Sequence, residues 1–513
     1  MKASNQTQGD KMKSNALQPN IAQTPDTKSM ATKAIEPQYG GVLRIANTYV
    51  LPPRMGVPGR INVGGIHVQP MVENFFRVDR AGRLVPQLAE SWEYDKDGLR
   101  LTLPLKKGIK FHDGTDFNAE AAKWSLLKAR EYNATLQHMS SIDIVDEYTI
   151  ILNVKSYSNH FLACLAYNGG GMFSPTAYKT YGEEYCLLHP VGTGPFKFVS
   201  YEPDVKLTVE RFDDYWQKGK PYLDKIEMLY VPDMKKAVDM LRHGQVDVVL
   251  NINGESADLL KSEGYVVTEL PWTMEGLNPD SLNADSPLAD KRVRQAIEYA
   301  IDRPAIADTI GHGYWRPLTQ LATEAVYGYN PAIEGRSYSP DKAKQLLAEA
   351  GYPNGFKTKL IGGEGMELSK LFAAIQKYLA AVGIEAEIEI AEPAIWKQYR
   401  ASKPWHNAML LNHYATDPNF TWSVFGFHSS KEYGHTSQLR NFDNIVMDML
   451  QARDYDTMAK NTQRLIKHVY DEALVIPIII DTSITARSKK VHGLEFYEFH
   501  LMKWKPADGW KEQ

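Results

Sequence analysis

Alternating apolar and polar positions mark the start of the folded part of the chain. The segments that carry this two-residue period, or a short apolar run bounded by turn residues, are residues 42–46, 101–105, 149–154, 196–201 and 206–211. Each is predicted to form a strand. Residues 118–130 instead repeat their apolar side chains at helical spacing, with Asn118 as the N-cap. The first half of the chain is therefore predicted to mix helices and strands.

Helical spacing is more frequent further along the chain. Residues 233–243 predict an amphipathic helix that ends at Gly244, and the apolar run 245–250 predicts a short buried strand after it. A helical face begins again at Arg292. A later helix is predicted to start after Ser339 and Pro340 and to end at Gly351. This order of elements is typical of layered α/β structure.

A strand–helix–strand unit is predicted from residue 357 to residue 390, with its helix at 368–381. Its first turn carries Gly363 and Gly365 but no third glycine at the spacing that pyrophosphate binding requires. We therefore interpret it as a plain βαβ unit of a Rossmann-like lobe and not as a dinucleotide site.

Length and charge narrow the classes of protein that remain. A chain of 513 residues exceeds one hydrophobic core and predicts two or three packed units. It contains no apolar stretch of the roughly 20 residues that span a bilayer. Its 58 Lys and Arg nearly balance its 62 Asp and Glu, so no basic field favours nucleic acid.

The first 38 residues differ from the rest in being polar and almost free of aromatic side chains. Such a segment is predicted to be a disordered tether, because it buries too little apolar surface to offset its ordering entropy. No apolar signal-peptide core follows Met1, which predicts either a cytosolic protein or the loss of a targeting segment. Cys164 and Cys186 are compatible with one disulfide or with two free buried thiols.

Three stretches together resemble the family 5 extracellular solute-binding proteins, which include the dipeptide-, oligopeptide- and nickel-binding components of ABC importers. They are residues 84–93 with 97–98 and 105–120, residues 191–198 with 211–226, and residues 290–303 with 339–356. The resemblance covers residues 39–513, the whole predicted folded body. Within the first stretch, His112 beside the turn at Asp113 and Gly114 is interpreted as structural and not as catalytic.

The resemblance implies an α/β fold with two lobes, like that of periplasmic binding proteins, and an extra subdomain in the first lobe. The implied limits are a tether at 1–38, lobe I at 39–270 completed by 480–513, an inserted subdomain at about 85–185, and lobe II at 271–479. Chain crossings near residues 270 and 480 would join the lobes, which close on a small ligand by hinge motion.

The resemblance further implies an extracytoplasmic, lipid-anchored monomer whose targeting segment has been removed. Its partners would be the ligand and the permease subunits of an ABC transporter, with no nucleic acid, no cofactor and no catalysis. The alternatives are a hydrolase or a sensor that uses the same cleft. The chain has none of the local hydrolase, metalloprotease or nucleotide-binding motifs, although a catalytic triad formed in space needs no such motif.

Ligand chemistry depends on one position in the second lobe. By resemblance, peptide-binding members place a carboxylate three residues before an Asp-Pro pair, where it binds the ammonium group of the ligand. Here the pair is Asp417 and Pro418, and Tyr414 occupies the position of the acid. An ammonium group buried without an anion suffers a large desolvation cost. The sequence therefore favours a sugar, an opine-like acid, a metal chelate or an aromatic solute over a free dipeptide.

The candidate ligand-binding residues are Tyr167, Asn168, Gly169, Trp272, Arg316, Asn412, His413, Tyr414, Thr416, Asp417 and His428. Successive glycines after Asn168 predict either a close backbone approach or a pivot, Trp272 offers a stacking face, and Arg316 offers an anion partner. For each residue, a purely structural role is the alternative. His413, His428 and His435 match no compact metal motif, so a metal ion is expected only as part of a bound complex.

Overall fold

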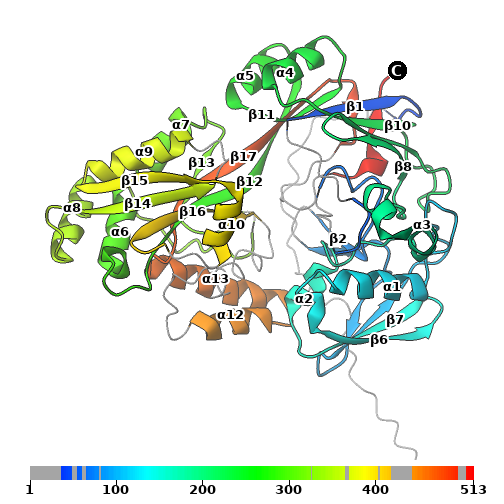
Figure 1. The fold of residues 1–513 in the computed structure, drawn as a ribbon, viewed down its shortest axis with the longest axis horizontal. Coiled ribbons are helices and arrows are strands. Elements are labelled where there is room, and N and C mark those ends of the chain that lie inside the picture. Colours follow the sequence, from blue (N-terminus) through cyan, green and yellow to red (C-terminus); the bar gives the residue numbers. More distant parts are fainter. Residues whose placement is uncertain are drawn as a thin grey trace, which may run out of the picture.

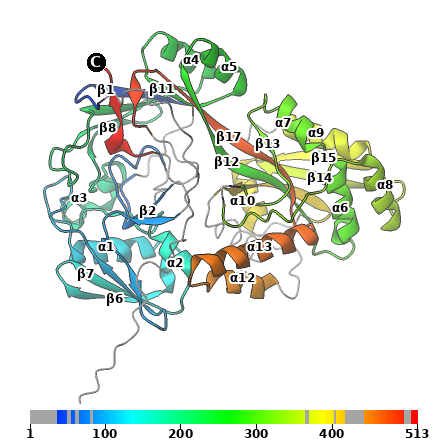
Figure 2. The same cartoon turned by 180° about the vertical axis from the view of Figure 1, so that it is seen from behind.

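The computed structural model describes residues 36–48, 55–59, 65–79, 83–324, 326–363, 369–401, 405–416, 442–494 and 504–513. It has two lobes joined by long strands that run from one lobe into the other (Figure 1, Figure 2). The fold is thus the two-lobed α/β fold predicted from the sequence. Of the helices in the described part of the chain, none is long and apolar enough to cross a membrane.

One sheet extends through both lobes in the order β15-β14-β16-β12-β17-β11-β1-β10-β9-β8, and β13 pairs with β17. Its strands are β1 (Val42–Asn47), β8 (Phe196–Glu202), β9 (Lys206–Arg211), β10 (Lys225–Tyr230), β11 (Val248–Ile252), β12 (Val266–Pro279), β13 (Arg316–Pro317), β14 (Phe356–Gly363), β15 (Ile384–Ala391), β16 (Ala408–Ala415) and β17 (Ile476–Arg487). Two short pairs lie outside this sheet, β2 (Phe76–Val78) with β3 (Leu84–Pro86) and β18 (Val491–His492) with β19 (Trp510–Lys511).

In lobe I, β1 lies between β10 and β11 and is parallel to both. Helices α4 (Met234–Arg242) and α5 (Gly254–Ser262) precede and follow β11 in the chain and lie next to each other at one end of the lobe (Figure 1), and α3 (Pro175–Leu188) lies in the same lobe. Strand β11 begins three residues later than the sequence predicts. The reason is that the Gln245 N–H still bonds the Met240 carbonyl and so completes the C-terminal turn of α4.

The inserted part of lobe I has its own sheet, in the order β4-β5-β7-β6. Its elements are β4 (Glu93–Tyr94), β5 (Arg100–Pro104), α1 (Ala119–Arg130), β6 (Met139–Asp146), β7 (Thr149–Val154) and α2 (Asn159–Cys164). Asn118 caps α1 as predicted, since its side chain accepts from the Ala121 N–H. The limits of about 85–185 for this subdomain stay a prediction.

Lobe II contains the predicted βαβ unit, in which β14 and β15 are parallel and α9 (Ser369–Ala380) connects them. Helices α6 (Lys291–Ala300), α7 (Arg303–Thr309), α8 (Pro340–Glu349) and α9 lie on one side of the sheet. Helices α10 (Pro393–Ala401), α12 (Phe442–Leu450) and α13 (Tyr455–Asp471) lie on the other. Separate apolar clusters therefore form on the two faces.

Two of the sequence interpretations concern isolated side chains. His112 is half-buried, with Nε2 3.0 Å from the Gly194 carbonyl, and desolvation lowers its pKa to about 4. It therefore stays neutral and joins the turn to the segment before β8, a structural role. Cys164 and Cys186 are both buried free thiols, so the disulfide alternative is wrong.

Candidate functional site at the lobe boundary

Strands β12 and β17 connect the lobes side by side. They pair antiparallel from Val266 with Arg487 to Leu277 with Ile476, and the register shifts first between Pro271 and Thr273 and again between Glu275 and Gly276. We call the first shift the register break. On the lobe I side of this break β17 pairs with β11, and on the lobe II side β12 pairs with β16. The break therefore marks the place where the sheet passes from one lobe to the other.

Directly after the break, four polar side chains gather on β12, β16 and β17. Glu275 is 1% exposed, and its Oε1 accepts from the Thr273 hydroxyl at 2.7 Å and lies 2.5 Å from Nδ1 of His413. Thr273 pairs with Asp481 in the sheet register, which sets the two carboxylates diagonally on one face. Burial, reinforced by the charge of Glu275, raises the pKa of Asp481 to about 6.

Sequence reasoning missed both acids. The available signal was an acid inside an otherwise apolar strand, as at Asp481 after Ile478, Ile479 and Ile480. A buried carboxylate needs a partner or a proton, so such a residue points to a polar contact across the sheet. The identity of the partner depends on register and was not accessible without the fold.

Tyr414 lies on the opposite face of the same strands. Its side chain is 3% exposed and packs in the lobe II core with Met274, and its hydroxyl donates to Oδ1 of Asn278. Glu275 and His413 instead lie on the same face as Leu277 and Leu411, which belong to the core on the other side of the sheet. Glu275 and Asp481 therefore lie on the other face of the sheet from Tyr414, and they do not supply a carboxylate at its position.

The other predicted ligand residues near Tyr414 lie at or beside the end of β16 and the register break in β12. The Thr416 hydroxyl lies 3.3 Å from the carbonyls of both Pro271 and Trp272, and Thr416 is 1% exposed. This contact fixes the end of β16 against β12. Asn412 is buried, whereas the His413 side chain is 37% exposed. Trp272 is half-buried at the register break.

The remaining predicted residues lie elsewhere. Tyr167 is 1% exposed within the core of the inserted sheet. A Cβ on Gly169 would lie 2.6 Å from Sγ of Cys164, so tight packing alone requires this glycine. Asn168 is half-buried between these two residues, and Arg316 is exposed on β13. Asp417 and His428 lie outside the described residues, as does His435. All eleven assignments remain predictions.

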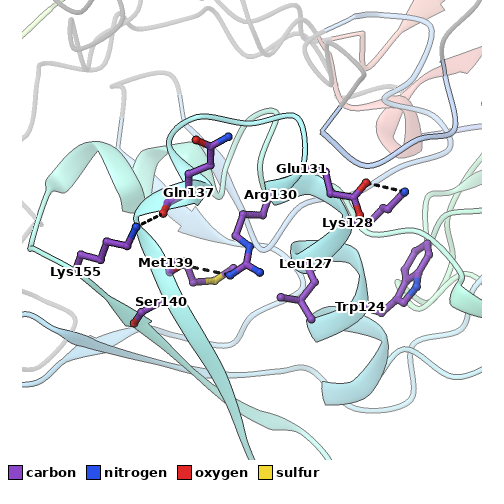
Figure 3. A pocket seen from close by; sticks show the side chains of 9 residues that line it. All are labelled: Trp124, Leu127, Lys128, Arg130, Glu131, Gln137, Met139, Ser140 and Lys155. Carbon is purple, nitrogen blue, oxygen red and sulfur yellow. Dashed lines mark hydrogen bonds and ion pairs between the residues drawn. The ribbon is translucent and has the colours of Figure 1, made fainter.

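A pocket of about 720 Å³ lies on the inserted subdomain between α1 and β6 (Figure 3). Its lining contains none of the predicted ligand residues. The lining side chains are Trp124, Leu127, Lys128, Arg130, Glu131, Gln137, Met139, Ser140 and Lys155. Within the described ranges, no group of three or more His, Cys, Asp or Glu is placed to hold a metal ion.

Comparison with known proteins decides the family. Residues 83–434 match the family of bacterial extracellular solute-binding proteins, family 5, middle region. The chain belongs to this family. It is a solute-binding protein of an ABC importer, as the sequence motifs predict, and such proteins take up a small ligand outside the cytoplasm and present it to permease subunits.

Individual relatives differ in what their names and structures say they bind. The glutathione-binding protein GsiB of Shigella flexneri is 30% identical over 441 residues, which is 82% of this chain and 85% of GsiB. The structure of DppA from Helicobacter pylori with the peptide STSA has a TM-score of 0.74 at 22% identity and covers 93% of this chain and 99% of DppA. The structure of NikA from Brucella suis with Fe(III)-EDTA has a TM-score of 0.80 at 21% identity and covers 92% of this chain and 100% of NikA.

Proposed function

We propose that this protein captures a small solute between its lobes and releases it unchanged to a permease, acting as a lipid-anchored monomer without catalysis. Family membership and the two lobes joined by β12 and β17 support capture by lobe closure. The names and structures of the relatives give a peptide, glutathione and a metal chelate as ligands. The shared fold therefore does not determine the ligand, which depends on the side chains that contact it.

Tyr414 is the observation that carries the choice of ligand. Its phenol is buried in lobe II and donates to Asn278, so this position presents neither a carboxylate nor another anion. The free ammonium group of a dipeptide would lose its hydration without gaining a charged partner there. The proposed ligands are therefore solutes that need no anion at this position: a sugar, an opine-like acid, a metal chelate or an aromatic compound.

A solute panel tests this proposal. The purified protein is heated with dipeptides, glutathione, opines, sugars and metal chelates, because a ligand that binds only the folded state raises the melting temperature. We expect stabilisation by one non-dipeptide class and recovery of that solute intact by mass spectrometry. Micromolar or tighter binding of ordinary dipeptides by calorimetry would contradict the choice of ligand. Chemical alteration of a bound solute would instead support the hydrolase alternative.

A further inference from the structure

The lobes touch a second time, at the end of the molecule remote from the place where β12 and β17 pass between them. Both views show α2 of the inserted subdomain beside α12 and α13 of lobe II (Figure 1, Figure 2). Hydrogen bonds join residues 449–453 to residues 96–97 and 157–159, which lie some 290 to 357 positions away in sequence. We call this contact the clasp.

Arg453 makes the charged half of the clasp. Its Nη1 donates to the Lys96 carbonyl at 2.7 Å, and its Nη2 donates to the Asp97 carbonyl at 2.9 Å. The guanidinium also lies 4.9 Å from the ring centre of Tyr157, within the range of a cation–π contact. One side chain of lobe II is thus held by three groups of lobe I.

The turn that receives Arg453 is built by local bonds. The Asp95 carboxylate accepts from the Leu99 N–H at 2.8 Å, and its carbonyl accepts from the Gly98 N–H at 3.0 Å. Gly98 has φ +74, and a Cβ there would lie 2.9 Å from Nη2 of Arg453. The turn therefore keeps its shape without Arg453, and its surface is suited to a guanidinium that arrives from the other lobe.

The neutral half of the clasp caps a helix. Asn159 is 7% exposed, and its Nδ2 donates to the Met449 carbonyl at 2.8 Å and approaches the Ala452 carbonyl at 3.5 Å. The Tyr157 hydroxyl donates to the same Ala452 carbonyl at 3.1 Å. Carbonyls at the C-terminal end of a helix have no partner within it. The Met449 carbonyl also accepts from the Ala452 N–H at 3.3 Å, so lobe I adds side-chain donors to the C-terminal turn of α12 and to the Ala452 carbonyl after it.

Every acceptor in the clasp is a backbone carbonyl, and every donor is a side chain. When the lobes separate, water can replace each of these bonds, since no carboxylate is left with an unpaired charge. Burial raises the pKa of Tyr157 to about 12, so its hydroxyl stays protonated and able to donate at neutral pH. Such a contact can form and break repeatedly without strain in either lobe.

We infer that Arg453 and Asn159 hold the two lobes closed from the side opposite the crossing strands, so that the closed form is populated before a ligand arrives. A closed form that already exists reduces the free energy that a ligand must supply for closure. The inference rests on the proposed capture between lobes for its biological use, but the clasp itself can be tested without any ligand.

The test measures the distance between the lobes in the ligand-free full-length protein. Spin labels are attached to cysteines introduced at Ser140 and Lys344, two exposed positions in lobe I and lobe II; the native Cys164 and Cys186 are buried. Double electron–electron resonance then gives the distance distribution. We expect Arg453→Ala and Asn159→Asp to lose the short-distance population that the wild type shows. An aspartate retains the shape of asparagine but cannot donate to either carbonyl.

Two further variants control the comparison. Arg464→Ala removes an arginine of lobe II that pairs with Asp448 in its own lobe at 2.5 Å, and it should leave the distances unchanged. Arg453→Lys keeps the charge and one donor, and it should restore part of the short-distance population. Should Arg453→Ala fail to fold, Arg453→Lys and Asn159→Asp carry the test.

The inference is wrong if the distributions of wild type, Arg453→Ala and Asn159→Asp coincide, or if Arg464→Ala shifts them equally. A lower melting temperature with unchanged distances would likewise make Arg453 a residue of structural stability only. None of these outcomes bears on the proposed ligand class, which the solute panel decides separately.

Discussion

The lobes of this protein are joined in two ways, and the two contacts differ in every physical respect. At the crossing, β12 and β17 share a ladder of backbone hydrogen bonds with apolar cores on both faces. At the clasp, a few side chains donate to backbone carbonyls of the other lobe. The crossing cannot open without unfolding the sheet, whereas the clasp exchanges its bonds with water.

This difference indicates that the crossing stabilises the folded lobes, whereas the clasp affects how the lobes move relative to each other. A hinge needs residues that absorb a change of direction while the sheet around them persists. The register break between Pro271 and Thr273 lies within the crossing and provides such a place. The clasp then decides how often the hinge is closed, without contributing much to the stability of either lobe.

The largest expected effect is from the crossing. Leu277→Ala removes a side chain that is 0% exposed in the core beneath β12 and should lower the free energy of unfolding by about 2 to 5 kcal/mol. Urea denaturation measures the change. Leu259→Ala, at a leucine of α5 that is 44% exposed, is the control and should cost far less. Equal losses in the two variants would show that the crossing is not a stability core.

The second largest effect is expected at Asp481, which lies next to Glu275 directly after the register break. The pKa of Asp481 rises from an ordinary 3.8 to about 6, so folding favours its protonated form. The resulting stabilisation is complete below pH of about 4 and is lost as pH rises through about 6. Asp481→Asn should therefore stabilise the protein by about 2 kcal/mol at pH 8 and by almost nothing at pH 4.

Melting curves from pH 4 to pH 8 provide the measurement for Asp481→Asn. The exposed Asp308→Asn on α7 is the matched control and should show no such pH dependence. A gain of equal size at both ends of the range would mean that Asp481 acts through packing and not through its charge.

A smaller loss is expected from Tyr414→Phe, which keeps the ring and removes the hydroxyl that donates to Asn278. Leaving this buried acceptor with one fewer donor should cost about 1 kcal/mol in urea denaturation. Since the phenol is 3% exposed, affinity for any solute found in the panel should stay unchanged. A large loss of affinity would place this hydroxyl at the ligand and revise its structural role.

The smallest effect on stability belongs to the clasp. Arg453→Ala should lower the free energy of unfolding by less than about 1 kcal/mol, because exposed contacts of this kind contribute little. The same variant should nevertheless shift the distance between the lobes, as argued above. A loss as large as that of Leu277→Ala would remove the distinction between the two contacts.

Local sequence signals located most of the regular structure. Strands at residues 149–154 and 206–211 were predicted with the bounds that the structure shows, because alternation with a buried face is visible in any window of six residues. The predicted cap Asn118 lies where a helix starts, and the helices predicted to begin at Asp233 and after Ser339 begin there, since capping depends only on residues three positions apart. Motifs of the same local kind identified the family.

The sequence did not reveal what the glycines after Asn168 are for. Three successive glycines predicted a close approach to a ligand, but a Cβ on Gly170 would lie 1.8 Å from the Leu165 carbonyl of the same segment. Close backbone approach is confirmed within the protein, since Gly169 and Gly170 pack against Cys164 and Leu165, and a ligand contact at this segment stays a prediction. Pattern alone does not distinguish a neighbour in the fold from a bound molecule.

By itself, then, the sequence determined most helices and strands, the family and the absence of an acid at Tyr414. Each of these depends on residues that are near neighbours along the chain. Only the tertiary structure decided that Glu275 faces Asp481 and that Arg453 reaches the Lys96 carbonyl. These pairs lie hundreds of residues apart, and their meeting depends on the register of β12 with β17 and on the closure of two lobes.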